Sequence, residues 1–272
     1  MNYPFGSGRQ LWIPYFLIFP GLFLYLIVAF GPSLATFGYS FTDATGTAGA
    51  TVNWVGLDNY EEFLFVGQAA RDNIDVVYRT VIFSVLVTSI QFGLGLLLAL
   101  LLNQNLFGTR FFRTVFFMPV ILGVVIQGLI WKLVLYPLGG PVAEIFSVFG
   151  IRNELLGGTG AFWWVIVVQI WANAGITMVI FLAGLQTVPE ELYEAARIDG
   201  ANSWQLFSRV TWPLITPSVN TNLILNIIGS LQAWQLFLIL IGYRNGTQVL
   251  GYVIFAQGFG ATGSASAAFR QG

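Results

Sequence analysis

The sequence contains no cysteine and no histidine among its 272 residues. The absence of cysteine excludes disulfides, thiol catalysis and cysteine-based metal sites. The absence of histidine removes the commonest general base and the commonest zinc ligand. An enzyme built from this chain would depend on carboxylates alone, and these lie mostly outside the apolar segments. We therefore expect no catalytic residue and no metal site.

Charge is also scarce. Only 8% of the residues are charged and 56% are hydrophobic, whereas soluble domains carry about 25% charged residues. So few charges cannot cover a water-exposed surface, so the main solvent of this chain is lipid. The composition predicts an integral membrane protein.

Five segments are long and apolar enough to cross a bilayer as helices, which takes about 20 residues each. We expect spans at about 11–37, 80–102, 114–136, 161–185 and 216–242. The first run is too long for the apolar region of a signal peptide. The runs are uniformly apolar rather than alternating, which is typical of helices and not of a barrel. The sequence predicts an all-α polytopic membrane protein, with residues 1–272 forming a single transmembrane domain.

The connections between spans bear on orientation. Residues 38–79 are long and acidic, while the short connection 103–113 carries Arg110 and Arg113 and no acid. Arginines divide evenly between the two sides of the membrane, but short loops count most in the positive-inside rule. The short loop therefore favours a cytoplasmic N-terminus.

Charge concentrates in one stretch, EELYEAARIDGANSWQLFSRVTWP, residues 190–213. Two residue pairs have the spacing of a helix-capping box. The first pair is Thr187 with Glu190, and the second is Asn202 with Gln205. Both pairs indicate the start of a helix, so two helices are expected here.

A glycine separates the two expected helices. The first should end near Asp199, because Gly200 favours the left-handed conformation that stops a helix. The second should end before Pro213, with small residues flanking the turn (Ala195, Ala196 and Ala201). Taken alone, this helix–glycine–helix segment is either a solvated loop with an interfacial helix or an element that docks on another protein.

The segment EAARIDGANSWQLFSRVTWP resembles the EAA loop of ATP-binding-cassette (ABC) importer permeases. The matching residues are Glu194, Ala195, Ala196, Gly200, Val210, Trp212 and Pro213, with Trp212 in place of the usual leucine. Four longer stretches resemble the carbohydrate-uptake branch, of the maltose and glycerol-phosphate permease type. They are GLDNYEEFL (56–64), GLLLALLLN (95–103), RTVFFMPVILGVVIQGLIWKL (113–133) and FLAGLQTVPEELYEAARIDGA (181–201). The similarity covers nearly the whole chain, and GLDNY points to the first of two permease subunits.

The resemblance implies the transmembrane-domain fold of ABC type I importers. That fold has six spans, so a sixth is expected beyond the tail SASAAFRQG. The coupling loop, residues 186–215, would sit in a groove of an ATPase subunit. The residues expected to make this contact are Glu194, Ala195, Ala196, Asp199, Gly200, Ala201 and Trp204.

The resemblance also implies the partners. These are a second homologous permease in a heterodimer, an ABC ATPase dimer and an extracytoplasmic solute-binding protein, all at a bacterial inner (plasma) membrane, with no nucleic acid. The chain has no G-x-x-x-x-G-K-[ST] phosphate-binding loop. ATP and Mg²⁺ are therefore expected on the ATPase, with no cofactor in this chain.

Polar residues inside apolar spans are costly without partners, so their positions are informative. Uncharged amides and aromatic rings suit sugars, but the same residues also make helix–helix hydrogen bonds worth only about 0.6 kcal/mol each. The resemblance to maltose-type permeases implies sugar contacts in the spans flanking the coupling loop and in the span holding Pro119. The candidate substrate-path residues are Gln127, Gln169, Asn173, Asn226, Ser230 and Trp234.

These observations favour the permease subunit of an ABC importer for a small sugar, glycoside or polyol. Lys132 is the only cation expected within a span, which favours a neutral substrate over a glycerol phosphate. A stand-alone channel or secondary transporter would require charged relays inside the spans, and these are missing. A membrane enzyme is disfavoured by the missing histidine and cysteine.

Overall fold

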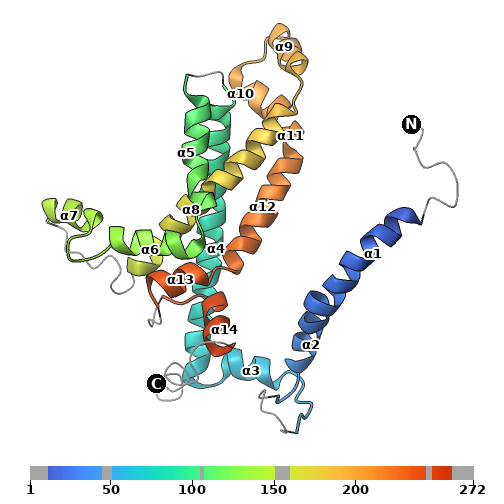
Figure 1. Cartoon of the computed structure of the whole chain (residues 1–272), viewed down its shortest axis with the longest axis vertical. Helices are drawn as coiled ribbons and strands as arrows, with labels where there is room; N and C mark the ends of the chain where they lie inside the picture. Colours follow the sequence, from blue (N-terminus) through green and yellow to red (C-terminus); the bar gives the residue numbers. More distant parts are fainter. Residues whose placement is uncertain (1–11, 45–50, 105–106, 151–159, 243–246, 259–272) are drawn as a thin grey trace. The chain divides into compact units, whose positions relative to one another are not determined.

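The computed structural model describes residues 12–44, 51–104, 107–150, 160–242 and 247–258. The chain divides into two compact units, residues 1–73 and 74–272. Within the described residues the regular structure is helical, apart from one isolated antiparallel bridge between Thr42 and Trp54. The all-α prediction is confirmed (Figure 1).

The first unit begins with a long apolar helix. It consists of α1 (Ile13–Tyr25), a π-helical turn η1 (Leu26–Phe30) and α2 (Gly31–Tyr39). The π turn directly precedes Gly31-Pro32, and the Gly31 N–H donates to the Leu26 carbonyl five residues back. Proline lacks an N–H, and a local widening of the helix is a common accommodation. The run Pro14–Tyr39 therefore remains one candidate span.

The GLDNY motif organises the loop between α2 and α3 (Asp58–Phe65). Asn59 Nδ2 donates to the carbonyls of Ser40 at 2.9 Å and Thr42 at 2.8 Å. The Tyr60 hydroxyl lies 2.7 Å from Ser40 Oγ. Asn59 and Tyr60 thus hold the chain that leaves α2, which gives the motif a structural role within this unit.

The second unit is built around three helices. They are α4 (Gly67–Leu102, which starts in the first unit), α8 (Gly160–Gln186) and α12 (Thr216–Leu231). Shorter helices complete the unit: α5 (Thr109–Ile121), α6 (Val124–Val134), α7 (Pro141–Val148), α13 (Gln235–Leu240) and α14 (Leu250–Gly258). The helix α4 begins before the expected span 80–102, because its first turns are polar yet still helical.

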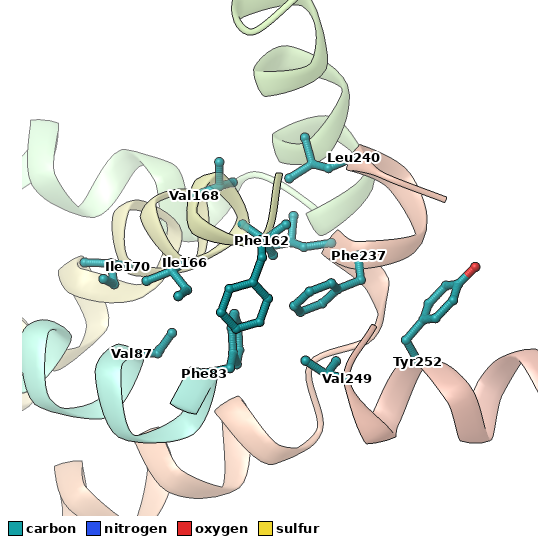
Figure 2. Close-up of a cluster of buried hydrophobic side chains, with 12 residues drawn as sticks. Phe83, Val87, Phe162, Ile166, Val168, Ile170, Phe237, Leu240, Val249 and Tyr252 are labelled. Carbon is teal, nitrogen blue, oxygen red and sulfur yellow. The ribbon is translucent and has the colours of Figure 1, made fainter. Parts of the chain in front are cut away.

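Two hydrophobic clusters form the core of this unit. In the first, Phe83 of α4 packs edge-on against Phe237 of α13 and Phe162 of α8, with ring centroids 5.1 and 6.1 Å away (Figure 2). The second cluster joins α4 and α8 through residues such as Met178 and Phe181, both fully buried. Since burial of each such side chain contributes about 1.5–3 kcal/mol, these clusters hold α4 against α8.

Two of the expected spans are each divided between two helices. The segment expected at 114–136 forms α5 and α6, whose axes differ by 101° around Leu122 and Gly123. The segment expected at 216–242 forms α12 and α13, and α12 is itself bent by 70° from the helix Ser203–Leu214. The described residues thus hold three continuous candidate spans, or up to five if each bent pair is one span.

A glycine brings α5 and α8 into close contact. A Cβ placed on Gly175 of α8 would collide with the Phe116 carbonyl oxygen and lie 3.0 Å from Phe117 Cα. Both neighbours are backbone atoms of α5, which cannot rotate away. Glycine at 175 is therefore required for this helix contact.

Candidate functional site

A buried polar cluster lies between α4, α8 and α12. Gln91 Nε2 donates to Asn226 Oδ1 at 2.8 Å and to Thr177 Oγ1 at 3.0 Å. Thr177 Oγ1 also donates to Asn226 Oδ1 at 3.3 Å. All three residues are buried. Asn226, a predicted substrate-path residue, therefore occupies the interior of the helix bundle and links three helices.

Ser230 extends this cluster one turn along α12. Its Oγ lies 2.7 Å from Ser84 Oγ of α4 and donates to the Ile227 carbonyl at 2.8 Å. Ser84 must then be the donor in the pair of serines. Ser230 is 2% exposed, so it too makes a helix–helix hydrogen bond.

The cluster retains unused hydrogen-bonding capacity. On the three helices of the cluster, the buried atoms without a hydrogen-bond partner among the described residues include Asn222 Oδ1, Asn226 Nδ2 and Thr88 Oγ1. The two contacts to Asn226 Oδ1 come from donors, which fixes the orientation of the Asn226 amide. Its Nδ2 donor is free to bind an additional acceptor.

Gln127 has a different environment from the other candidates. It is buried on α6, and its Nε2 donates to the carbonyls of Pro119 at 2.8 Å and Leu122 at 2.9 Å. Carbonyls at the end of a helix lack intrahelical partners. Gln127 therefore stabilises the break between α5 and α6.

Gln169 and Asn173 lie half-buried on α8, where Asn173 Nδ2 donates to the Gln169 carbonyl at 3.0 Å. Between them, Trp171 packs edge-on against Trp131 at 5.6 Å. Trp234 stacks on Phe255 with centroids 3.9 Å apart and planes at 14°. One face of the predicted stacking ring is thus already covered by a residue that the sequence did not suggest.

The structure therefore brings Asn226 and Ser230 into one cluster and places Gln127, Gln169 and Trp234 among other contacts. The polar stripe of α4 was missed. Its members recur every three or four residues along an apolar helix (Thr80, Ser84, Thr88 and Gln91), and all are buried. That period marks one helix face, so the stripe could have been found from the sequence.

The coupling loop folds as α9 (Glu190–Ile198), α10 (Ser203–Gln205), a π-helical turn η2 (Leu206–Thr211) and α11 (Trp212–Leu214). Gly200 lies between α9 and α10 with φ +81°, so the predicted left-handed stop is confirmed. The Asn202–Gln205 capping box is also confirmed, with both hydrogen bonds at 2.9 Å.

Two local predictions for this loop were wrong. Thr187 forms no capping box with Glu190, because Pro189 is the N-cap of α9 and the Thr187 hydroxyl, just past the end of α8, donates to the Gly184 carbonyl at 2.7 Å. The second helix does not end before Pro213 but continues to Leu214. The preceding π turn, in which the Trp212 N–H donates to the Phe207 carbonyl, widens the helix just before the proline ring.

The predicted coupling residues lie on the accessible side of this loop. Glu194, Ala195, Asp199, Gly200 and Trp204 are exposed, while Ala196 and Ala201 are half-buried. Two large apolar side chains flank the glycine turn, Ile198 at 86% exposure and Trp204 at 71%.

The loop is also braced internally. The hydroxyls of Tyr193 in α9 and Thr211 in η2 lie 3.0 Å apart, and the Ala201 N–H donates to the Ala196 carbonyl at 2.9 Å. A braced corner with exposed apolar side chains can bind another protein.

Comparisons with known proteins match nearly the full length of the chain. The family described as "Binding-protein-dependent transport system inner membrane component" matches residues 91–268. The probable starch degradation products transport system permease protein AmyD of Thermoanaerobacterium thermosulfurigenes is 30% identical, over 94% of this chain and 86% of its own length. The sn-glycerol-3-phosphate transport system permease protein UgpA of Agrobacterium fabrum is 30% identical, over 91% of this chain and 84% of its own length.

A solved structure shares the fold. It is a bacterial alginate ABC transporter in complex with an alginate pentasaccharide-bound periplasmic protein, and the matching chain has a TM-score of 0.75. The match is 23% identical and covers 96% of this chain and 86% of that chain. The predicted ABC importer transmembrane-domain fold is confirmed.

Proposed function

The chain belongs to the binding-protein-dependent transport system inner membrane component family, and from this premise we propose that it forms half of the translocation path for a small sugar, glycoside or polyol. It is a permease subunit of an ABC importer, a transport protein rather than an enzyme. Its long apolar helices place it in the membrane.

The character of the buried polar cluster supports a neutral substrate. Its described members are uncharged amides and hydroxyls: Ser84, Gln91, Thr177, Asn226 and Ser230. Amides pair with sugar hydroxyls, whereas a phosphate ester would call for cationic groups. The one cation expected within a span, Lys132, is exposed on α6 beyond the 101° bend. The name of the relative AmyD refers to starch degradation products, which also supports a sugar as the substrate.

The second candidate is a glycerol-phosphate permease, since UgpA is equally identical to this chain. Uptake of a labelled sugar that is unaffected by excess glycerol phosphate would favour the first candidate. A ligand-melting screen of the solute-binding protein identifies the sugar to use. Uptake of glycerol phosphate without uptake of any sugar would contradict the sugar proposal.

The coupling loop is proposed to dock on an ABC ATPase dimer, with ATP and Mg²⁺ bound there. The supporting observation is the exposed corner at Gly200, flanked by Ile198 and Trp204. This assignment puts the loop and the N-terminus in the cytoplasm. A second homologous permease and an extracytoplasmic solute-binding protein complete the proposed importer at a bacterial-type inner membrane.

The experiment that tests this proposal substitutes the glycine of the corner. Apart from Gly200 and its two chain neighbours, no described atom lies within 4 Å of a Cβ built on Gly200. Its φ of +81° strains any side chain placed there, so the effect on a partner is separated from this strain by a control glycine of similar backbone conformation. In Gly200→Asp we expect normal membrane insertion but loss of uptake and of substrate-stimulated ATP hydrolysis.

The matched control is Gly139→Asp. Gly139 has φ +95° and equally open surroundings, but it lies outside the coupling loop. The substitution introduces similar backbone strain at a site away from the proposed ATPase contact. Uptake by the Gly139→Asp variant should therefore stay near the wild-type rate. Retained uptake in Gly200→Asp, or purification of a stable homo-oligomer without an ATPase, would contradict the proposal.

A further inference from the structure

A cavity of about 570 Å³ lies where α4 ends, α5 begins and α8 ends. Its lining is mainly polar and includes Asn103, Gln104, Arg110, Arg113 and Gln186. Gln186 is the last residue of α8, directly before the coupling loop. The cavity therefore lies at the coupling-loop end of this unit, where Figure 1 also shows the start of α5 and the helices α9 and α10.

The cavity carries positive charge that nothing in the described chain neutralises. Arg110 and Arg113 are three residues apart on α5, so their side chains share a face. No Asp or Glu is among the lining residues. Arg113 is half-buried, and its Nε is buried with no hydrogen-bond acceptor among the described residues. A buried charged donor without an acceptor is costly, so the site calls for an anion.

Exposed aromatic side chains lie in the cavity lining and on the first turns of α5. Phe107 lines the cavity and is fully exposed, and Phe111 and Phe112, outside the lining, are 67% and 48% exposed. Aromatic side chains gather at the level of lipid headgroups. Further along α5, Val115 and Met118 are exposed as well. A ligand with a phosphate in the cavity and acyl chains along α5 would satisfy both the charge and the apolar surface.

We propose that this cavity binds the headgroup phosphate of an anionic phospholipid, with Arg110 and Arg113 holding the phosphate and the amides of Asn103, Gln104 and Gln186 available as further donors. Arginine pairs with phosphate through two parallel N–H donors. Basic pockets between helices on the cytoplasmic side bind such headgroups. The proposal uses the proposed function only to place this end of the chain in the cytoplasm. The exposed aromatic side chains of Phe107 and of the first turns of α5 favour a lipid over a carboxylate of the ATPase.

The test measures lipid binding by the full chain, purified in detergent with its co-purifying subunits, by native mass spectrometry. Phosphatidylglycerol is titrated against phosphatidylcholine, and inorganic phosphate is added in a separate arm. We expect phosphatidylglycerol to be retained preferentially. The double variant Arg110→Gln/Arg113→Gln should lose about tenfold or more in affinity, because each basic side chain at the surface contributes a several-fold factor.

The matched control is Arg197→Gln/Arg209→Gln. It removes two exposed arginines of the coupling loop, outside the cavity, and should leave lipid retention unchanged. The variant Arg110→Lys/Arg113→Lys keeps both charges and should retain an intermediate affinity, which provides a second measurement if the glutamine variant is unstable.

Three results would overturn the proposal. The first is equal retention of both lipids by the wild-type chain. The second is displacement of the lipid by inorganic phosphate at equal concentration, which would make free phosphate the ligand. The third is loss of the co-purifying ATPase in the glutamine variant with lipid retention intact, which would assign the arginines to that partner. Lipid binding is measured without transport, so failure of the Gly200→Asp experiment would leave this result standing.

Discussion

Gln91 Nε2 lies 2.8 Å from Asn226 Oδ1, joining α4 to α12 across 135 residues of sequence. Both residues are buried, and Thr177 of α8 bonds to each of them. A polar side chain in an apolar span is unfavourable unless it is paired. The pairing therefore specifies how these three helices meet.

Breaking this contact should destabilise the fold modestly. Gln91→Leu leaves Asn226 Oδ1 with Thr177 alone, and we expect a loss of about 1 kcal/mol, since interhelical hydrogen bonds in membranes average about 0.6 kcal/mol and reach about 1.7. The measurement is a double-mutant cycle of Gln91→Leu and Asn226→Ala in denaturant unfolding. The control is Asn220→Ala, an exposed amide on the same helix, which should change the free energy of unfolding little. Additive effects would show that the two residues do not interact.

Substituting Gln127 should lower the stability of the protein. Gln127→Met removes the two donors to the Pro119 and Leu122 carbonyls while keeping the side-chain length. We expect a loss of about 1–3 kcal/mol, because two acceptors are affected in a buried site. The unfolding midpoint in detergent tests this. Gln235→Met makes the same chemical change at an exposed position, so an equal effect there would exclude the specific role.

Gly175→Ala should separate α5 from α8. The added Cβ meets the Phe116 and Phe117 backbone, and overpacking of this kind typically costs about 1–3 kcal/mol. Thermal unfolding of the purified protein measures it. Gly93→Ala is the control, because a Cβ on Gly93 of α4 meets no described atom within 4 Å outside its own helical turns, and alanine favours helix by up to about 1 kcal/mol. An unchanged midpoint in Gly175→Ala would contradict the close contact.

The apolar runs predicted the helices well because lipid requires every backbone group to be satisfied within the segment, and only helices do this for single spans. The Gly200 turn and the Asn202 cap were predicted because both are local patterns. The 101° bend between α5 and α6 was not foreseen. It depends on Gln127 bonding to two carbonyls, five and eight residues earlier, which no periodic pattern reveals.

The candidate site shows the same limit. Asn226 and Ser230 were singled out as polar residues inside an apolar span, but their partners Gln91 and Ser84 lie more than a hundred residues away. The position of a polar residue in a span does not reveal which residue covers it. Likewise, Trp234 was predicted to line the substrate path, but its stacking on Phe255 depends on how the chain folds back.

The loop around Asp43 should respond to acid. Hydrogen bonds from the Asn53 backbone N–H, at 2.7 Å, and from Asn53 Nδ2, at 2.9 Å, lower the pKa of Asp43 below its ordinary value. A lowered pKa in the folded state means that the contribution is present above the ordinary value of 3.8 and is lost as pH falls through the lowered one. We expect the Asn53 amide resonance in NMR to shift only below that ordinary value. Asp43→Ala should abolish the transition, and a transition at higher pH would contradict the assignment.

The two capping patterns of the coupling loop should differ in their response to alanine. Asn202→Ala removes the acceptor for the Gln205 N–H, and loss of such a cap typically costs about 1 kcal/mol. Because α10 follows the Gly200 corner, a frayed α10 should also lower uptake while insertion stays normal. Thr187→Ala is the matched control, since its hydroxyl only bonds back to Gly184 and no cap is lost. Hydrogen exchange of the loop, measured beside uptake, tests both. Faster exchange in Asn202→Ala but not in Thr187→Ala is expected, and equal exchange in the two variants would show that the Asn202 box does not hold the loop.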